Sequence, residues 1–387
     1  MKRSRRNFIE LSIKAGVALP LIASSLVSCG STEEKSPSDS QKDKSKLKIL
    51  LLGGTSFLGP HQIAYALSQG HSVSTFTRGK TKPTIYQDLF RKVEQLVGDR
   101  QDDLESLKGK KWDVVIDNSG HKAEWTARSA ALLKDSCDLY LYTSSTGVYY
   151  PYLGNTIEES EKLVTVVPEG IDAEMKMEYD YGVMKTKSEQ AALKEFGADR
   201  TIIVRPTYMF GPADQTDRFT YWPVRLSQGG ETMVPGKSDD PVQYIDVRDV
   251  ATWMIKLAEQ RKTGIFNAVG PADDQTMYSF VQEAQSAFDV PSTFVYIDDY
   301  EFLKEHNVHY IIPWIMPIEN NYGSSRVSNS KALANGLEIR PLVDSIRDTH
   351  AWWFSDAVSQ DRRDKLTSSP ESVMAREEML LDQWAAR

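Results

Sequence analysis

The sequence predicts an α/β fold in which a doubly wound parallel sheet precedes a smaller C-terminal lobe. Two observations carry this prediction. From Leu47 onward, short apolar runs alternate with segments long enough for a helix, and the first run ends in a glycine-rich turn, Gly53 to Gly59. Parallel strands that helices cover on both faces read as such apolar runs, and the helices are the crossovers between them. The expected architecture is therefore of the Rossmann type.

Six strands are expected in chain order, each followed by a helix-length segment. The first leads through the glycine turn into a helical pattern that reaches Gly70. A smaller substrate lobe with elements that return to the sheet is expected over residues 207–360, and a helical tail over residues 361–387. The expected strands are Lys48 to Leu52, Ser72 to Phe76, Lys92 to Val97, Val114 to Ile116, Leu139 to Thr143 and Thr201 to Val204.

The composition is that of a globular protein, since 40% of the 387 residues are hydrophobic and 26% are charged. No uncharged apolar run reaches about 18 residues, so a membrane-spanning helix is not expected. The net charge is −8. Because an acidic protein repels a phosphate backbone, nucleic-acid binding is not expected as its main task. No metal site is expected, because no metal-ligand spacing occurs in the sequence.

The N-terminal residues 1–28 are typical of an export signal, with a basic start and an apolar run too short to span a bilayer. Arg5-Arg6 and its neighbours resemble a twin-arginine signal, whose route carries folded proteins; an ordinary secretory signal is the alternative. Leu26 to Cys29 resembles a lipobox, in which the cysteine thiol takes a lipid, although Cys29 could stand there by chance. Residues 29–46 read as a flexible tether, because residues 30–45 contain no aromatic or aliphatic side chain. The expected location is periplasmic or at the cell surface, with a lipid anchor in a membrane.

The glycine turn after the first strand is typical of dinucleotide binding, since backbone N–H groups there approach a pyrophosphate at the start of a helix. We therefore expect residues 47–206 to form a domain that binds NAD or NADP. A tight connection without a ligand is the alternative. The expected contacts come from Gly53, Thr55, Ser56, Phe57, Leu58 and Gly59, with Ser56 in the middle place of the glycine pattern.

Two further positions bear on the cofactor. Where the second strand ends, an NAD-binding site commonly carries a carboxylate for the ribose 2′-hydroxyl, whereas this chain has Thr77-Arg78. Arg78 therefore favours NADP, with a solvated surface arginine as the alternative. Asp99, in the sequence Val97-Gly98-Asp99 that closes the third strand, is placed either to reach the adenine amine or to cap the next turn.

Three residues are candidates for catalysis. Tyr181 and Lys185 are four residues apart and therefore lie on one face of a helix. A phenol is a poor base at neutral pH unless a nearby positive charge stabilises the phenolate, and Lys185, which is also expected to contact the cofactor, can supply that charge. Ser145 follows the fifth strand at the carboxyl edge of the sheet, where ligands of such folds bind. Tyr181 would then move the proton of a substrate hydroxyl held by Ser145, unless this hydroxyl run merely caps the strand.

With these motifs, the chain from Leu47 to Trp353 resembles the extended short-chain dehydrogenase/reductase superfamily, in particular its NAD-dependent epimerase/dehydratase family. The glycine turn and Asp217-Arg218-Phe219 are more similar to the atypical branch, which includes chloroplast RNA-binding relatives. Sugar-nucleotide 4,6-dehydratases of the superfamily carry an Asp-Glu pair where this chain has Thr146-Gly147, which argues against a dehydratase. Further segments that carry the resemblance are Val204 to Pro206, Phe210 to Pro212, Gln243 to Ala251 and Gly264 to Asn267.

The resemblance implies that segments after the sixth strand form the substrate pocket. Tyr208, Asp217, Arg218 and Gln243 are candidates for polyol contacts, and each reads equally well as a loop or strand-edge residue. His121, just beyond the fourth strand, is a further candidate, with a solvated histidine as the alternative.

Together these features predict an NAD(P)-dependent epimerase or oxidoreductase that acts on a sugar, a glycoside or a glycan-derived carbinol. Export in the folded state implies a cofactor that is loaded in the cytoplasm and tightly bound, because the cell envelope offers no obvious supply of free NAD(P). Nucleotide sugars are scarce there too, which favours a free carbohydrate. The alternative is a non-catalytic dinucleotide-binding scaffold that tethers or senses a glycan or RNA. Homo-oligomerisation stays open.

Overall fold

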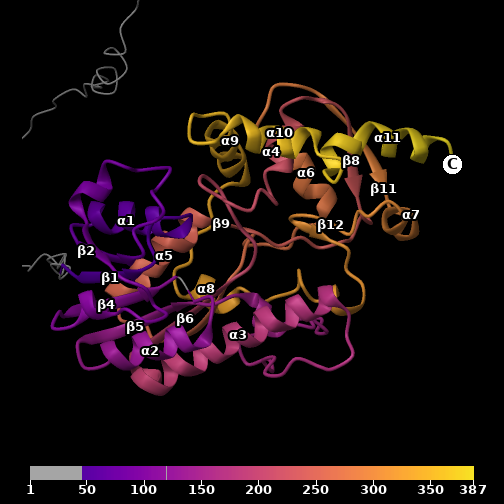
Figure 1. Ribbon diagram of the computed structural model, residues 1–387. Coiled ribbons are helices and arrows are strands. Elements are labelled where there is room, and N and C mark those ends of the chain that lie inside the picture. The colour runs from indigo at the N-terminus through magenta and orange to yellow at the C-terminus, as the bar shows by residue number, and fades with distance from the viewer. Residues whose placement is uncertain (1–45, 119) are drawn as a thin grey trace, which may run out of the picture. The chain divides into compact units, whose positions relative to one another are not determined.

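Seven parallel strands form the central sheet of the protein, in the order β10-β6-β5-β4-β1-β2-β3 (Figure 1). The computed structural model describes residues 46–118 and 120–387. This sheet confirms the predicted fold class, and it includes all six expected strands. The strands are β1 (Lys48–Leu52), β2 (Ser72–Thr77), β3 (Glu94–Val97), β4 (Trp112–Asp117), β5 (Cys137–Thr143), β6 (Thr201–Pro206) and β10 (Gly264–Ala268).

The strand boundaries differ from the expected ones at a few ends. β3 begins at Glu94 rather than Lys92, because Leu89–Lys92 forms a 3-10 turn before it. The seventh strand, β10, comes from the segment after residue 206 and pairs with β6 at the edge of the sheet. Its parallel register places Phe266 beside Val204.

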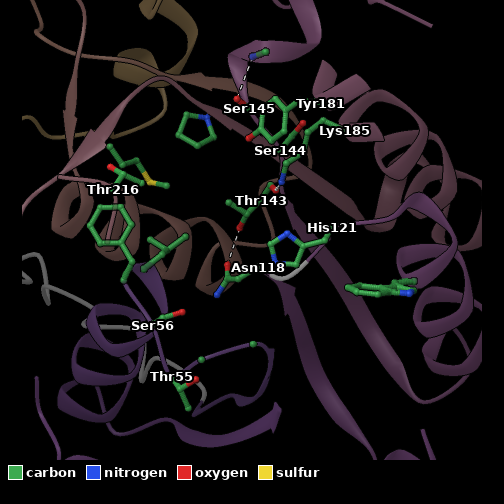
Figure 2. A pocket seen from close by; sticks show the side chains of 18 of the residues that line it. Thr55, Ser56, Asn118, His121, Thr143, Ser144, Ser145, Tyr181, Lys185 and Thr216 are labelled. Atoms are coloured by element: carbon green, nitrogen blue, oxygen red, sulfur yellow. Dashed lines mark hydrogen bonds between the residues drawn. The ribbon is translucent and has the colours of Figure 1, made fainter. Parts of the chain in front are cut away.

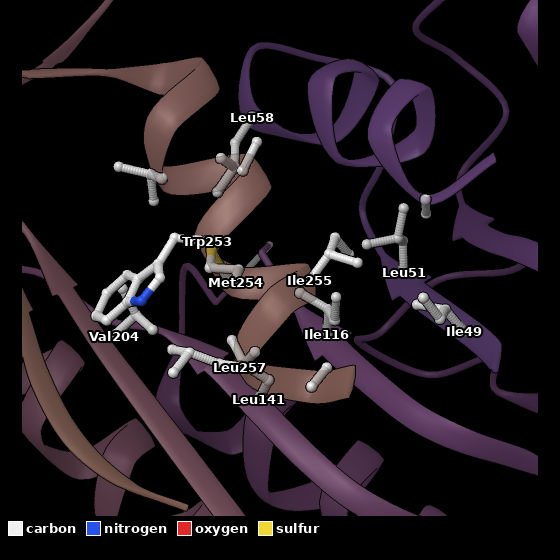
Figure 3. Close-up of a cluster of buried hydrophobic side chains, with 14 of the residues drawn as sticks. Ile49, Leu51, Leu58, Ile116, Leu141, Val204, Trp253, Met254, Ile255 and Leu257 are labelled. Atoms are coloured by element: carbon white, nitrogen blue, oxygen red, sulfur yellow. The ribbon is translucent and has the colours of Figure 1, made fainter. Parts of the chain in front are cut away.

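Helices cover both faces of the sheet, and the period-2 alternation of each strand decides which side chains each layer contacts. On β1, Ile49 and Leu51 belong to the hydrophobic cluster under α1 (Leu58–Ser68) and α5 (Val247–Glu259), as Figure 3 shows. Leu50 and Leu52 belong to the opposite cluster, under α2 (Ala123–Leu133) and α3 (Ala173–Phe196). All four side chains are at most 1% exposed.

The sequence of α5 explains why it packs on the sheet. Val250, Trp253, Met254 and Leu257 recur at helical spacing and are all buried, so they form one apolar stripe. The helix begins at a cap, because the carboxylate of Asp246 accepts a hydrogen bond from the backbone N–H of Arg248 at 2.8 Å.

A smaller lobe follows β6 and has its own aromatic core, which includes Trp222, Phe280 and Trp314. The lobe contains the parallel pair β8–β11, and the short parallel pair β7–β9 precedes part of it in the chain. Its strands are β7 (Met209–Phe210), β8 (Gly230–Pro235), β9 (Ile245–Asp246), β11 (Ser292–Ile297), β12 (Tyr310–Ile311) and β13 (Trp314–Ile315). The remaining helices are α4 (Tyr221–Leu226), α6 (Met277–Gln285), α7 (Tyr300–Glu305), α8 (Ser330–Ala334), α9 (Leu342–Trp353), α10 (Gln360–Ser368) and α11 (Val373–Ala385).

The C-terminal helices are held to this lobe by a buried carboxylate. Glu377 of α11 accepts hydrogen bonds from the backbone N–H of Met233 at 2.8 Å and from the hydroxyl of Tyr221 at 3.1 Å. It also pairs with the guanidinium of Arg225. Because a buried charge is costly unless it is paired, these contacts fix α11 against α4 and β8.

The predicted export signal, its Arg5-Arg6 pair, the lipidation site Cys29 and nearly all of the tether lie outside the described residues, so they stay predictions. In the part of the chain that is described, no helix is both long and apolar enough to cross a membrane.

One buried histidine joins α1 to the smaller lobe. The Nε2 atom of His61 lies 2.9 Å from the carbonyl oxygen of Pro212 and can donate a hydrogen bond to it. Burial lowers the pKa of His61 to about 4, although the Pro212 bond and Asp246 oppose the shift; the charges of Arg248 and Arg340 add to it. The imidazole is therefore neutral in the folded protein at neutral pH.

His61 should make the fold sensitive to acid. The pKa of a histidine is about 6.5 in an unfolded chain, so between that value and about 4 the unfolded chain binds the additional proton. Neutral His61 therefore contributes up to roughly 3 kcal/mol to the free energy of unfolding. This contribution is complete above pH 6.5 and is lost as the pH falls toward 4. Urea unfolding at several pH values should show this slope in the wild type and a shallower one in His61→Gln, which keeps a donor for Pro212. An unchanged slope in the variant would exclude His61 as the cause.

Candidate active site

A cavity of about 880 Å³ lies at the carboxyl edge of the sheet, where the ends of β1 to β6 meet. Thirteen of the residues proposed from the sequence line it, and they come from segments far apart in the chain. Figure 2 shows Thr55 and Ser56 at one end of this cavity and Ser145, Tyr181 and Lys185 at the other. The thirteen are Gly53, Thr55, Ser56, Phe57, Leu58, Arg78, Asp99, His121, Ser145, Tyr181, Lys185, Tyr208 and Arg218.

The glycine turn has the geometry of a phosphate cradle. Gly53 has a φ of 77°, a value that few residues other than glycine adopt. Gly59 does not line the cavity, but it lies so close to Gly54 that a Cβ atom at Gly59 would be 2.5 Å from the Gly54 Cα atom. Phe57 precedes α1 with a φ of 45° and forms no side-chain cap. The first N–H groups of α1 are thus left without a side-chain acceptor from the cap position, as anion binding at a helix start requires.

The ends of β2 and β3 border the same end of the cavity. Arg78, Lys80 and Asp99 all line it. The Asp99 carboxylate accepts a hydrogen bond from the N–H of Gln101 at 2.9 Å, so it caps the next turn as well as facing the cavity. Residues 77–81 contain no carboxylate. The residues present therefore fit a dinucleotide, with basic groups where the ribose of its adenosine half would bind.

At the other end, one face of α3 carries Tyr181, Lys185 and Glu189 at intervals of four residues. Both Tyr181 and Lys185 line the cavity, but Tyr181 is 43% exposed whereas Lys185 is only 7% exposed. The face therefore runs from an accessible phenol to a buried ammonium and then to a buried carboxylate.

Lys185 is held by backbone and aromatic groups. Its Nζ atom donates a hydrogen bond to the carbonyl oxygen of Thr143 at 3.0 Å, and it lies 5.2 Å and 5.9 Å from the ring centroids of Tyr142 and Tyr181. Burial acts to lower the pKa of Lys185, but the interactions with Tyr142, Tyr181 and Asp117 outweigh it and raise the pKa above its usual value. Lys185 is thus a stable cation, and it forms no ion pair within residues 46–118 and 120–387.

Two glycines allow α3 to approach the turn after β5. A Cβ atom at Gly182 would lie 2.5 Å from the carbonyl oxygen of Gly147, and a Cβ atom at Gly147 would lie 2.9 Å from the Tyr181 ring. Gly147 belongs to a 3-10 turn, Thr146–Tyr149, that Ser145 caps by accepting a hydrogen bond from the Gly147 N–H at 3.1 Å. Ser145 thus caps the turn that follows β5 rather than the strand itself, and it also lines the cavity beside Tyr181.

A buried polar network holds α3 against the sheet next to Ser145 and Tyr181. Glu189 accepts two hydrogen bonds from the guanidinium of Arg205, at 2.8 and 2.7 Å, and one from the Ser144 hydroxyl at 2.5 Å. Arg205 also donates to the Tyr149 hydroxyl at 2.7 Å, which in turn donates to Asn267 at 2.7 Å. The network joins α3 to β5, β6 and β10, so it fixes the position of the face that carries Tyr181.

Asn118 lines the middle of the cavity, and the sequence reasoning missed it. Its side chain accepts a hydrogen bond from the Thr143 hydroxyl at 2.7 Å (Figure 2). It also donates one to Gln62 at 2.6 Å, so it links β5 to α1. It is the first residue after β4, as Asp99 is the second after β3, and that placement at a strand end was the available signal. His121, on the same loop, packs edge-on against Trp125, and burial and nearby cations, Lys185 first among them, lower its pKa.

The smaller lobe contributes Tyr208, Thr216 and Arg218 to the lining of the cavity. Met177 and Glu178, one turn before Tyr181 on α3, line it as well. They were not proposed from the sequence, although their spacing of three and four residues from Tyr181 places them on its face.

Besides Gly59, two proposed residues are not among those that line the cavity. Asp217 forms an ion pair with Arg362 of α10 instead, with its carboxylate oxygens 2.7 and 2.5 Å from the guanidinium nitrogens. The Gln243 side chain makes two hydrogen bonds with the backbone of Val327, at 2.8 and 3.0 Å. Each therefore has a structural partner, in line with the loop and strand-edge alternatives. Within the described ranges, no cluster of three or more His, Cys, Asp or Glu side chains could hold a metal ion.

Comparisons with known proteins find similarities in sequence and in fold. Residues 49–268 match the NAD dependent epimerase/dehydratase family. The chain is 30% identical over 240 residues to chloroplast stem-loop binding protein of 41 kDa b from Arabidopsis thaliana, in a match that covers 58% of this chain and 59% of that relative's length.

Two solved structures show the same fold. One is UDP-N-acetylglucosamine 4-epimerase from Methanobrevibacter ruminantium in complex with UDP-N-acetylmuramic acid (TM-score 0.57, 16% identity, 80% of this chain and 98% of that one). The other is the Bordetella bronchiseptica enzyme WbmH in complex with NAD+ (TM-score 0.56, 13% identity, 81% of this chain and 100% of that one).

The close approach of α3 gives a direct test of how Tyr181 is positioned. Gly182→Ala would put a methyl group 2.5 Å from the Gly147 carbonyl, and overpacking of this kind costs about 1–3 kcal/mol. We expect a lower urea midpoint of unfolding in Gly182→Ala. Lys187→Ala, on the exposed side of the same helix, is the matched control and should leave the midpoint nearly unchanged. Equal midpoints in the two variants would show that the contact tolerates a side chain.

Proposed function

The chain belongs to the NAD dependent epimerase/dehydratase family, and we propose that it is an NAD(P)-dependent epimerase or oxidoreductase acting on a carbohydrate alcohol. The substrate is a sugar, a glycoside or a glycan-derived carbinol. The observation that carries the proposal is the placement of Ser145, Tyr181 and Lys185 in the same cavity as the glycine turn. A phosphate cradle and a proton-transfer group thus face one space.

The residues that would hold the dinucleotide lie along the strand ends. The turn from Gly53 to Leu58 would bind the pyrophosphate at the start of α1, Arg78 and Asp99 would contact the adenosine half, and Lys185 would contact the nicotinamide half. The bound dinucleotide supplies a hydride acceptor and donor. One of the solved structures with this fold was determined with NAD+, which supports the assignment.

Proton transfer is assigned to Tyr181. In this mechanism Ser145 donates or accepts a hydrogen bond at the substrate oxygen and so orients the carbinol. The Tyr181 phenol moves the proton of that oxygen. Lys185, a buried cation 5.9 Å from the Tyr181 ring centroid, stabilises the negative charge that develops there. Its hydrogen bond to the Thr143 carbonyl keeps the ammonium in place.

The expected export of the protein bears on the type of reaction. Arg5-Arg6 and Cys29 support transport of the folded chain and attachment to a membrane by lipid. A cofactor loaded before export has to be tightly bound and regenerated within each turnover, which favours a redox-neutral epimerisation. The same location favours a carbohydrate without a nucleotide, whereas the solved epimerase with this fold is named for a nucleotide sugar.

The alternative function is a dinucleotide-binding scaffold that tethers a glycan or RNA without turnover. The relative with 30% identity, which is named as a stem-loop binding protein, favours it. The acidic net charge of −8 opposes RNA binding. A scaffold also has no use for a buried lysine beneath an accessible tyrosine, so we favour the enzyme.

The first test of this function is Tyr181→Phe. Removal of the phenol hydroxyl should reduce turnover by about 10²- to 10⁴-fold, the usual contribution of general acid–base catalysis. The bound dinucleotide should remain, because the glycine turn is unchanged; mass spectrometry of the intact protein measures it. Tyr179→Phe, on the same helix but outside the cavity, is the control and should keep its activity. Substantial turnover by Tyr181→Phe would rule out this mechanism.

Lys185→Ala extends the test. The ammonium acts on both Tyr181 and the nicotinamide half, so this variant should lose activity and also part of its affinity for the dinucleotide. Titration of the dinucleotide-free protein, followed by fluorescence, gives that affinity. If the variant binds the dinucleotide as tightly as the wild type does, Lys185 does not contribute to cofactor binding.

Arg78 tests the choice of cofactor. A charged hydrogen bond to the 2′-phosphate is worth about 1.5–3 kcal/mol, so Arg78→Gln should weaken NADP binding by roughly 10- to 100-fold and leave NAD binding nearly unchanged. Arg91→Gln, at an exposed arginine whose side chain is 84% accessible, is the matched control. Wild-type protein that prefers NAD, or an equal loss for both dinucleotides, would contradict the assignment.

A further inference from the structure

We propose that Arg218 binds a carboxylate of the substrate, so that this site takes an acidic carbohydrate, a hexuronic acid or its glycoside. This inference rests on the proposed function and names the substrate class of the same cavity. It starts from the part of the cavity next to Tyr181, where Tyr208 and Arg218 of the smaller lobe lie close enough to Glu178 of α3 for their charges to interact.

Arg218 has a free cationic group at a ligand site. Its guanidinium lies 5.1 Å from the ring centroid of Tyr208, and both residues line the cavity. Within the described ranges, no carboxylate lies within ion-pair distance of Arg218, whereas Arg205, Arg225, Arg248 and Arg362 each have one. Stacking on an aromatic ring orients the guanidinium plane and leaves its N–H groups available to a ligand.

The loop that carries Arg218 is fixed from outside the cavity. Asp217 has a φ of 57°, a strained value for a residue with a side chain. The bidentate ion pair with Arg362 holds it there, and Arg362 also donates to the carbonyl oxygen of Asp214. The Arg362 guanidinium lies 5.4 Å from the Trp352 ring centroid. Arg218 is therefore pre-organised by the C-terminal helix α10, and binding a ligand there requires little further ordering.

The other cations that line the cavity are committed elsewhere. Arg100 pairs with the buried Asp117, and Lys185 donates to the Thr143 carbonyl. Arg78 and Lys80 belong to the end of β2, at the cofactor end. Arg218 is thus the cation that the described part of the cavity offers to a substrate beyond Tyr181.

The charges at this end of the cavity favour a carboxylate over a diphosphate. The planar fork of Arg218 can form a bidentate pair with a carboxylate or with a phosphate, so the neighbouring Glu178 decides between them. Glu178 lines the same end, close enough for the charge of Arg218 to act on its pKa, and its negative charge would oppose a second anionic group. Burial raises the pKa of Glu178, and Arg218 only partly counters that effect. The carboxyl oxygens can accept hydrogen bonds from sugar hydroxyls. The pair fits a monoanionic, polyhydroxylated ligand.

The test is a binding measurement on Tyr181→Phe, which is expected to keep its dinucleotide and to turn over slowly enough for binding to be measured. Calorimetry compares methyl glycosides of glucuronic and galacturonic acid with their methyl esters, which lack the charge. We expect at least one acid to bind 10-fold or more tightly than its ester. In an otherwise identical protein with Arg218→Gln, this difference should disappear, and Arg218→Lys should keep part of it, because a lysine retains the charge but not the fork.

Arg326→Gln is the matched control. Arg326 also stacks on a tyrosine, 4.3 Å from the ring centroid of Tyr322, but it does not line the cavity, so its removal should leave the acid preference intact. UDP-galactose is the probe for the other source of anionic charge. If it binds through Arg218 while the uronates do not, the group recognised is a diphosphate and the proposal is overturned.

Failure of this inference is distinguishable from failure of the proposed function. A protein that holds dinucleotide but binds acids and esters equally, or binds neither, overturns the role of Arg218 and leaves the hydride-transfer site standing. A protein that binds no dinucleotide refutes the proposed function itself, whatever the uronates do. Preference for the acids that persists in Arg218→Gln would place the carboxylate site elsewhere.

Discussion

The site depends on one packing constraint, the close approach of α3 to the turn after β5. Gly182 and Gly147 meet without side chains between them, and a Cβ atom at Gly182 would lie 2.5 Å from the Gly147 carbonyl oxygen. This approach lays the Tyr181 ring on Gly147 and lets Lys185 reach the Thr143 carbonyl. If α3 were displaced by the width of a methyl group, both placements would be lost. The positions of Tyr181 and Lys185 therefore depend on the close approach of the two backbone segments.

α3 carries two buried charged groups, and only one of them has a counter-ion. Glu189 forms an ion pair with Arg205 through two hydrogen bonds, as buried charges require. Lys185 has no counter-ion within the described ranges, because its neighbours are a carbonyl oxygen and aromatic rings. An ammonium kept without a counter-ion is available to a negative charge that develops at Tyr181 during a reaction.

The fold and much of the cavity were predictable from the sequence, because both follow from local patterns. Apolar runs identified the six strands, and the end of each strand identified a point on one sheet edge, so Ser145, Asp99 and Arg78 were placed correctly at the cavity. Contacts between distant segments were not predictable. Asp217 and Arg362 are 145 positions apart, and only the folded smaller lobe reveals that they pair. Gln243 and Val327 are a second example, 84 positions apart. Asn118 could have been found by the same strand-end rule that identified Asp99.

The central claim is that the glycine turn binds a dinucleotide and that Tyr181 acts on a substrate beside the same dinucleotide. The most direct measurement is to denature the purified protein and identify the released small molecules by mass spectrometry, with their amount per chain and their oxidation state. The account predicts that NAD or NADP is released in an amount close to one per chain. Absence of any dinucleotide, together with no binding of NAD or NADP when either is titrated into the folded protein, would contradict it.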